Sequence, residues 1–289
     1  MHFSKPEEFF DPAQKKPAKA QVNSGLGFLN VSQVKKEEAI RLHYNVLYRT
    51  WGAQHWWPAD TAFEVIVGAY LTQNTAWTNV ERALANLRAA RVLSVDGIRR
   101  IRLPRLERLI RSSGYFRQKA KRLKNFVTFL DKEYGGSLDQ LFSQPTSTLR
   151  EELLELNGVG PETADSILLY AGNHPVFVVD AYTRRVLERH EILPAGADYE
   201  EIRSLYERAL APIVDQQQYT PSALATAAES GIRGASHPPS AMSTAKRTAL
   251  VQVYNEMHGL IVGVGKNHCG KSKPKCDGCP LQPFLPRAK

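Results

Sequence analysis

Cysteine is scarce in this chain, and its few copies are confined to one end. The 289 residues include three cysteines, Cys269, Cys276 and Cys279. An odd number of thiols gathered near the C-terminus excludes a disulfide framework and favours a reducing compartment. No apolar run is long enough to cross a bilayer, and the first residues lack the apolar centre of a secretory signal. We therefore expect a cytoplasmic protein without membrane attachment, associated with the nucleoid if the source is bacterial.

Strand-type alternation and internal repeats are also missing, whereas apolar residues recur at helical spacing. The fold class is therefore predicted to be all-α. Residues 1–32 show little periodicity and are expected to form a mobile leader. Residues 213–245 are rich in Gln, Ser, Thr and Ala, and predict an insertion with a short helix near 221–230. The helical segments expected from the periodicity are 37–51, 63–71, 79–87, 115–130, 149–156, 162–171, 181–189, 199–210 and 248–262.

Acidic residues are few where basic ones gather. The formal net charge is +9, and residues 99–124 hold eleven Lys or Arg side chains against the single acid Glu107. The last stretch, 266–289, adds six basic residues against Asp277. Such clustering is typical of a polyanion-binding surface, although a solvated helix face has the same composition.

The segment 156–164, Leu-Asn-Gly-Val-Gly-Pro-Glu-Thr-Ala, is the most informative motif. Gly158, Val159 and Gly160 predict a tight hairpin over 156–161 that opens a helix at a proline. Glycines expose bare N–H groups, and a helix N-terminus adds partial positive charge, so this turn suits a phosphate. The apolar run Val176–Val179 ends about twenty residues later in a lone acid, Asp180. Taken singly, the turn could serve any helix start and Asp180 could be an ordinary N-cap.

In combination, these motifs resemble the helix–hairpin–helix DNA glycosylase superfamily, in particular its endonuclease III group. The resemblance implies a two-lobed helical domain over residues 33–265, with a central lobe at about 65–180 and a cleft between the lobes. Double-stranded DNA with a damaged base would be the partner, and a monomer is the default. The expected DNA contacts are Gln73, Asn74, Gly158, Val159, Gly160, Thr163, Lys119 and Lys121.

The resemblance makes Asp180 the catalytic carboxylate. It would stabilise positive charge on the sugar as the base leaves, and it could orient the attacking water. The bifunctional members carry a lysine nucleophile in the hairpin where this chain has Glu162. A carboxylate cannot form a Schiff base, so we expect a monofunctional enzyme with weak or absent lyase activity.

Three of the four tryptophans lie between residues 55 and 77. This stretch, the segment 113–123 and the pair His258-Gly259 look like the 3-methyladenine glycosylases of the endonuclease III type. The implied base pocket consists of Trp56, Trp57, Pro58, Trp77 and Lys266. Electron-rich indoles suit a cationic methylated purine, but the same rings could instead plug the interface between lobes. Leu260 replaces a lysine that this branch carries. A thymine–guanine mismatch or damaged-pyrimidine glycosylase, and a non-catalytic DNA-binding module, remain alternatives.

The tail 266–289 matches part of a family metal loop. The spacing of Cys269, Cys276 and Cys279 fits the first three ligands of the endonuclease III [4Fe–4S] cluster, but Leu285 stands at the fourth position. The sequence leaves three alternatives open. A structural cluster could take His268, Asp277 or solvent as its fourth ligand, zinc could bind the cysteines with His268, or the loop has lost its metal.

Overall fold

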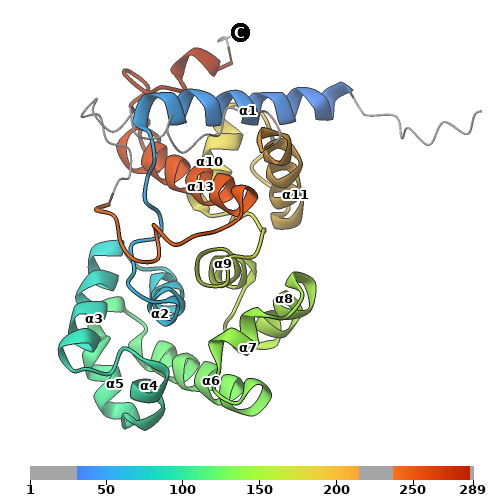
Figure 1. Ribbon diagram of the computed structural model, residues 1–289. Coiled ribbons are helices and arrows are strands. Elements are labelled where there is room, and N and C mark those ends of the chain that lie inside the picture. The colour runs from blue at the N-terminus through green and yellow to red at the C-terminus, as the bar shows by residue number, and fades with distance from the viewer. Residues whose placement is uncertain (1–30, 215–236, 287–289) are drawn as a thin grey trace, which may run out of the picture.

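The computed structural model describes residues 31–214 and 237–286, and within these ranges the fold is helical without any strand (Figure 1). The all-α prediction is therefore confirmed. The predicted helix near 221–230 and residues 1–30 of the predicted leader lie outside the described residues. None of the described helices has the length and apolar character that a membrane span needs.

The helices form two groups, one above the other in the view of Figure 1. The lower group contains α2 (Ala62–Thr72), α3 (Trp77–Ala89), α4 (Val95–Arg100), α5 (Leu103–Leu109), η1 (Arg111–Ser113), α6 (Phe116–Tyr134), α7 (Leu138–Phe142), α8 (Thr146–Glu155) and α9 (Pro161–Ser166). The upper group contains α1 (Val31–Trp51), α10 (Ala181–Arg189), α11 (Tyr199–Leu210), η3 (Ala211–Ile213), α13 (Ala249–Asn267) and η5 (Gln282–Phe284).

The π-helical segment η2 (Ile167–Ala171) lies at the junction of the two groups, where it contacts both α2 and α13. All five of its residues are buried. Residues 162–171 were expected to form one regular helix, but the helical hydrogen bonding widens after Ser166. Such π-helical turns are rare and frequently occur at functional sites.

Local sequence signals explain most helix starts. The side chains of Thr61, Ser94, Ser137, Asp198 and Thr248 each accept a hydrogen bond from a backbone N–H of the following first turn. α5 begins at Leu103, with proline in its first turn. Two helices run further than expected: α6 continues to Tyr134 and α13 to Asn267. The leader prediction was two residues too long, since α1 starts at Val31.

A buried ion pair fastens α8 to α9 and α11. The Arg150 guanidinium donates from Nε to Oδ1 of Asp165 at 2.7 Å and from Nη2 to Oδ2 at 3.2 Å. Nη2 also donates to Glu200 at 2.5 Å. The hydroxyl of Tyr199 donates to Asp165 Oδ2 at 2.9 Å, so the fully buried carboxylate of Asp165 has three donors. Helices from both groups therefore meet on one charged centre.

The apolar run Val176–Val179 is extended and buried, but it pairs with no strand in the described parts of the chain. Its backbone is satisfied by side chains instead. The N–H of Phe177 donates to Glu207 Oε1 at 3.0 Å, and the N–H of Val179 donates to the Tyr199 hydroxyl at 3.3 Å. Because buried N–H groups need acceptors, these two contacts fix the segment that leads to Asp180.

We expect Asp165→Ala to lower the free energy of unfolding by about 3–5 kcal/mol, because it leaves the Arg150 guanidinium largely buried without its main partner. Urea denaturation of the full chain measures this effect. The control is Asp131→Ala, which removes an exposed pair with Arg99 and should change stability far less. Equal losses in the two variants would contradict the structural role of the buried pair.

Candidate active site and DNA-binding hairpin

Asp180 is the N-cap of α10. Its Oδ1 accepts from the N–H of Thr183 at 2.8 Å and from the Thr183 hydroxyl at 2.9 Å. The side chain keeps 13% of its surface exposed, so solvent contacts the carboxylate. The N-cap interpretation is therefore confirmed, and it leaves Oδ2 free to face elsewhere. These capping bonds hold the carboxylate in place through Oδ1 and leave Oδ2 available for other contacts.

Oδ2 of Asp180 faces a buried histidine from α13. Nε2 of His258 lies 3.6 Å from this oxygen, and its Nδ1 lies 2.6 Å from the hydroxyl of Tyr170 in η2. Both His258 and Tyr170 are buried. Burial disfavours the charged form of Asp180, but His258 and the Thr183 donors outweigh it, so the pKa of Asp180 lies below its ordinary value. The carboxylate is therefore ionised at neutral pH.

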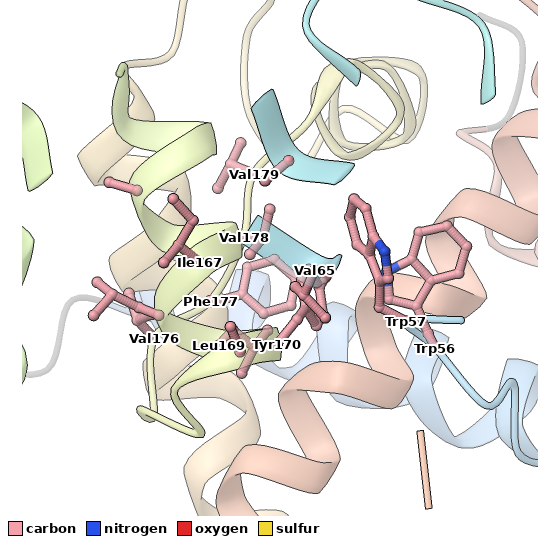
Figure 2. Close-up of a cluster of buried hydrophobic side chains, with 14 of the residues drawn as sticks. Trp56, Trp57, Val65, Ile167, Leu169, Tyr170, Val176, Phe177, Val178 and Val179 are labelled. Atoms are coloured by element: carbon pink, nitrogen blue, oxygen red, sulfur yellow. The ribbon is translucent and has the colours of Figure 1, made fainter. Parts of the chain in front are cut away.

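Three tryptophans form one aromatic cluster next to this acid. The ring centroids of Trp57 and Trp77 are 5.2 Å apart, and those of Trp56 and Trp57 are 5.6 Å apart. Trp57 lies 5.3 Å from Tyr170 and Trp56 lies 6.0 Å from His258. Figure 2 shows the two neighbouring indoles on one side of Tyr170, with Phe177 and the Val176–Val179 run on the other. The predicted pocket tryptophans are thus brought together with the predicted acid.

The loop that carries Trp56 and Trp57, residues 52–61, is held by α13. The N–H of Gln54 donates to Glu256 Oε2 at 2.7 Å. A Cβ atom at Gly259 would lie 3.0 Å from Gln54 and 3.1 Å from Trp56, so the glycine permits this close approach. The pair His258-Gly259 therefore serves two tasks, since the histidine faces the acid and the glycine faces the tryptophan loop.

The described end of the predicted insertion covers the same loop. The N–H of Ala59 donates to the Ser240 hydroxyl at 3.2 Å, and the N–H of Met242 donates to the Ala59 carbonyl at 3.0 Å. The ring of His237 lies 5.5 Å from Trp56 and 6.3 Å from Trp77. Residues 237–245 therefore form part of the wall around the tryptophans rather than a separate loop.

Lys266 and Pro58 complete the set of predicted pocket residues. Nζ of Lys266 lies over the Trp56 ring, 5.7 Å from its centroid. Burial lowers the pKa of Lys266, against the opposite influence of Glu81 and Asp180. Pro58 is half-buried in the tryptophan loop. Both residues lie where the sequence analysis expected them, beside the indoles.

Glu162 lies in the first turn of α9, and its side chain is exposed to solvent. The nearby Asp180 carboxylate raises the pKa of Glu162, while His258 and Arg184 act in the opposite direction. Because the side chain is exposed, solvent screens part of this repulsion. No amine is present at this position.

The hairpin is clamped to the end of α2 by Gln73. Nε2 of Gln73 donates to the Gly158 carbonyl at 2.9 Å and to the Thr163 hydroxyl at 2.9 Å, and Arg122 donates to its Oε1 at 2.6 Å. Gly158 has φ of +80°, and a Cβ atom there would strike the Arg122 guanidinium. The start of α9 has no side-chain cap after Gly160, and its first residue, Pro161, has no N–H, so the N–H groups of the first turn have no helical partner.

The predicted DNA contact by Lys119 is wrong. Its side chain is buried, and Nζ donates to the Leu71 carbonyl, the Thr75 hydroxyl and the Ser113 carbonyl at 2.7–2.8 Å. An ammonium with three protein acceptors has no donor left for a phosphate. The sequence could not separate this lysine from its neighbours, because it lies in the same basic run. Lys119 instead fastens the turn after α2 to the start of α6.

The other predicted DNA residues differ in accessibility. Asn74 is exposed, with φ of +51°, at the turn after α2, and Lys121 is exposed on α6. Val159 is largely buried beneath the hairpin, so only its backbone lies near the surface. Of the basic stretch 99–124, the exposed members are Arg99, Arg100, Arg102, Arg105, Arg108, Arg111, Arg117 and Lys121.

The three cysteines surround one cavity of about 240 Å³ with Leu285 in its wall. All three thiols are free, and Nη1 of Arg189 lies 3.1 Å from Cys269 Sγ. No group of three or more His, Cys, Asp or Glu side chains in the described residues is arranged to hold a metal ion. Three cysteines line the cavity, one thiolate fewer than the four that usually hold a [4Fe–4S] cluster.

Three residues of the site went unrecognised in the sequence. Tyr170 lies in an apolar run, so the sequence predicts an ordinary core residue there. His237 lies in a loop that carries no recognisable motif. His258 was noted only as part of a family segment, with no role. A buried histidine on an apolar helix is the one signal that could have drawn attention to it. Only the fold brings these three rings together around the tryptophan cluster.

The fold is all-α, its hairpin suits a phosphate, and a partly exposed carboxylate lies beside aromatic rings. These features indicate a protein that acts on nucleic acid. The family model "HhH-GPD superfamily base excision DNA repair protein" matches residues 67–212. The chain belongs to this superfamily. It is 40% identical over 250 residues to the Methanocaldococcus jannaschii protein named "Putative DNA repair glycosylase MJ1434", which covers 86% of this chain and 96% of that protein.

Solved structures show the same fold. The Helicobacter pylori 3-methyladenine DNA glycosylase MagIII, bound to 1,N6-ethenoadenine, superposes with a TM-score of 0.60 at 29% identity, covering 80% of this chain and 97% of that one. An endonuclease III in a non-covalent DNA complex gives a TM-score of 0.61 at 19% identity, covering 86% and 94%. The protein is thus a DNA glycosylase of the HhH-GPD, endonuclease III-like family.

We expect His258→Gln to shift the acid limb of the pH–rate profile toward higher pH. A catalytic Asp180 would have to be ionised, so the rate would fall as the pH drops through its pKa. Removing the imidazole raises that pKa toward the ordinary value, so activity is lost at a higher pH. Single-turnover base release, measured over the acid range, reports the shift. An unchanged acid limb would show that His258 does not set the charge state of Asp180.

Proposed function

We propose that this protein is a monofunctional glycosylase that removes alkylated purines, such as 3-methyladenine, from double-stranded DNA. One observation carries the proposal: the ionised carboxylate of Asp180 lies next to a cluster of tryptophans, joined to it through His258 and Tyr170. The MagIII relative, itself a 3-methyladenine glycosylase, supports the same substrate class.

The chemistry follows from the charge of the leaving base. A base inside the duplex must be flipped out before it can be cut from its sugar. An N-methylated purine is already cationic, so its bond to C1′ breaks readily and leaves positive charge on the sugar. The Asp180 carboxylate stabilises that charge and orients a water molecule for attack. The enzyme then needs little proton transfer to the base.

The tryptophans supply recognition in this proposal. A methylated purine cation gains about 0.5–2 kcal/mol by stacking on an indole face. In the structure Trp56 and Trp77 contact each other and His237, so a base enters only if one of these rings moves. Lys266 lies over the Trp56 ring and would retreat from a cationic base. Stacking on the indoles thus selects a base by its positive charge rather than by hydrogen bonds to the edges of the base.

A second candidate substrate rests on a different observation. The indole N–H groups of Trp57 and Trp77 are buried and have no acceptor among the described residues. Buried donors generally have partners, and the carbonyl groups of a neutral pyrimidine would satisfy them. A thymine or uracil mispaired with guanine, or a damaged pyrimidine, is therefore the alternative class. The two classes differ in charge, and base-release assays separate them.

DNA contacts are proposed at the hairpin and on the faces beside it. The backbone from Gly158 to Gly160 and the uncapped start of α9 would bind a phosphate. Exposed Asn74 and Lys121 would contact the DNA directly. Gln73 and Thr163 are held within the protein, so we propose that they shape the hairpin rather than fill the gap left by the flipped base.

We propose that the three cysteines hold a [4Fe–4S] cluster at the cavity that they line. Such a cluster supplies a rigid, multiply bonded centre that orders the loop around it. The loop carries exposed Lys271, Lys273 and Lys275, which would then be presented together to DNA phosphates. Base removal itself uses Asp180 and the aromatic rings and requires no redox step.

We expect the wild-type protein to release 3-methyladenine or 7-methylguanine from methylated DNA, and Asp180→Asn to lose at least about a hundredfold in rate. Asparagine is also a good N-cap, so α10 should remain intact and the change tests charge alone. Chromatography of the released bases gives the rates. Asp198→Asn, the same change at the N-cap of α11, is the control and should leave the rate unchanged.

Release of mispaired thymine or oxidised pyrimidine in place of alkylpurine would replace the first substrate class with the second. If neither substrate set yields a base while DNA binding persists, the protein is a binding module without catalysis. Unchanged rates in Asp180→Asn would contradict the assignment of this carboxylate.

We expect borohydride to trap no covalent adduct between the protein and DNA that contains an abasic site. Glu162 replaces the lysine that forms a Schiff base, so no amine stands at the hairpin position. The full chain is incubated with abasic duplex and reductant, then examined by denaturing electrophoresis. Glu162→Lys is the matched variant and should gain an adduct. A wild-type adduct that disappears in Lys266→Ala would instead reveal an amine nucleophile on α13.

A further inference from the structure

The imidazole of His258 is a buried polar group that lies among aromatic rings. The ring centroids of Trp56, Tyr170 and Phe177 lie 6.0, 5.8 and 6.4 Å from its own. Two polar groups of the described residues face its nitrogens. The Tyr170 hydroxyl lies 2.6 Å from Nδ1, and Oδ2 of Asp180 lies 3.6 Å from Nε2. A neutral imidazole donates through one nitrogen and accepts through the other, so the position of its proton decides what the carboxylate of Asp180 faces.

The contact between Tyr170 and His258 favours one position of that proton. Burial and the nearby Asp180 carboxylate raise the pKa of Tyr170 well above its ordinary value, so the phenol keeps its own proton. Among the described residues, Nδ1 of His258 is the acceptor that this hydroxyl meets. A buried hydroxyl needs an acceptor, and Nδ1 can accept only if it carries no proton. The imidazole proton then lies on Nε2, the nitrogen that faces Asp180.

Nε2 of His258 is buried and has no hydrogen-bond partner among the described residues. It faces Oδ2 of Asp180 at a distance slightly longer than a hydrogen bond. Oδ1 of the same carboxylate is already held by Thr183, so the carboxylate cannot turn away. Hydrogen bonds of a catalytic site are often long before substrate binds and shorten in the complex. An N–H on Nε2 is therefore in position to become a donor to Oδ2.

The π-helical segment η2 explains how Tyr170 reaches α13. An α-helix turns by about 100° per residue, so one extra residue in a turn rotates the side chains that follow by about that angle. Tyr170 lies near the end of η2, after the turn has widened, and η2 contacts α13. Its side chain therefore points in a direction different from the one that a regular continuation of α9 would give. The irregular turn has a purpose if this hydroxyl must meet His258.

We propose that Tyr170 is a positioning residue that holds His258 as the neutral tautomer with its proton on Nε2, and that this N–H donates to Oδ2 of Asp180 when damaged DNA binds. The inference rests on the proposed role of Asp180 in base removal. His258 is then a fixed donor and takes up no proton during the reaction. The bond from C1′ to the base breaks and leaves its electron pair on the base, the water oxygen bonds to C1′, and the water proton passes to Asp180.

Nuclear magnetic resonance of the full chain, labelled with nitrogen-15 in its histidine rings, reads the tautomer directly. The signals of His258 are those missing from the spectrum of His258→Gln. At neutral pH we expect wild type to carry the proton on Nε2 and to leave Nδ1 bare. Tyr170→Phe keeps the ring and removes the donor to Nδ1, so the ratio of the two tautomers should shift about tenfold toward the form with the proton on Nδ1.

Kinetics give a second, separate readout. Tyr170→Phe should slow single-turnover release of methylated bases by about tenfold. The affinity for the same DNA should stay unchanged, because the Tyr170 side chain is buried and cannot touch the duplex. Tyr206→Phe is the matched control: it removes another fully buried hydroxyl, from a ring on α11 that stacks on Phe177, and it should change neither the tautomer nor the rate. If Tyr170→Phe fails to fold, the wild-type spectrum still tests the assigned tautomer.

The outcomes separate the inference from the proposal beneath it. A proton on Nδ1 in wild type, or a doubly protonated ring at neutral pH, would overturn the inference. A Tyr170→Phe spectrum identical to wild type would also overturn it, because the hydroxyl would then not determine the tautomer. Equal effects of Tyr206→Phe would show a general loss of packing instead. If the spectra agree with the inference but wild type releases no base, the proposed function falls while the tautomer assignment stands.

Discussion

The position of Asp180, the proposed catalytic acid, depends on an extended segment that no strand of the described residues supports. Side chains perform the task that neighbouring strands perform elsewhere. Tyr199 accepts the N–H of Val179 and donates to Asp165, which in turn is neutralised by Arg150. A charged centre buried between three helices thus determines where Asp180 stands. Because an unpaired charge there would be costly, the position of Asp180 is coupled to the stability of the junction between α8, α9 and α11.

Much of this molecule follows from local signals in the sequence. Helical periodicity and N-cap residues predict the elements, since each depends on residues only a few positions apart. The turn at Gly158–Gly160, the acid Asp180 and the tryptophans Trp56, Trp57 and Trp77 could be assigned because the family motif fixes their order. The structure gathers the three tryptophans into one cluster that adjoins His258, which in turn faces Asp180. The π-helical turn of η2 carried no such signal, because its residues read as ordinary apolar helix.

What escaped prediction depends on contacts between distant segments. Lys119 belongs to a basic run, and only the fold shows that the turn after α2 supplies its three acceptors. Gln73 reads as an exposed polar residue until the hairpin closes on it. His258 lies 78 positions from Asp180, and no short-range pattern relates the two. Such pairings arise from the packing of helices, which the sequence encodes only through the complete core.

α13 serves several tasks on successive turns, and this arrangement restricts how the protein can diverge. Glu256 and Gly259 position the tryptophan loop, His258 faces the acid, and Gly265 leaves room for Tyr182 of α10. A substitution on this helix that reshaped the proposed base pocket would also disturb the charge of Asp180. Changes in lesion preference within the lineage should therefore accumulate in residues 55–58 and 237–245, which contact the tryptophans but not the acid. Substrate range and catalytic competence can then evolve on separate segments of one chain.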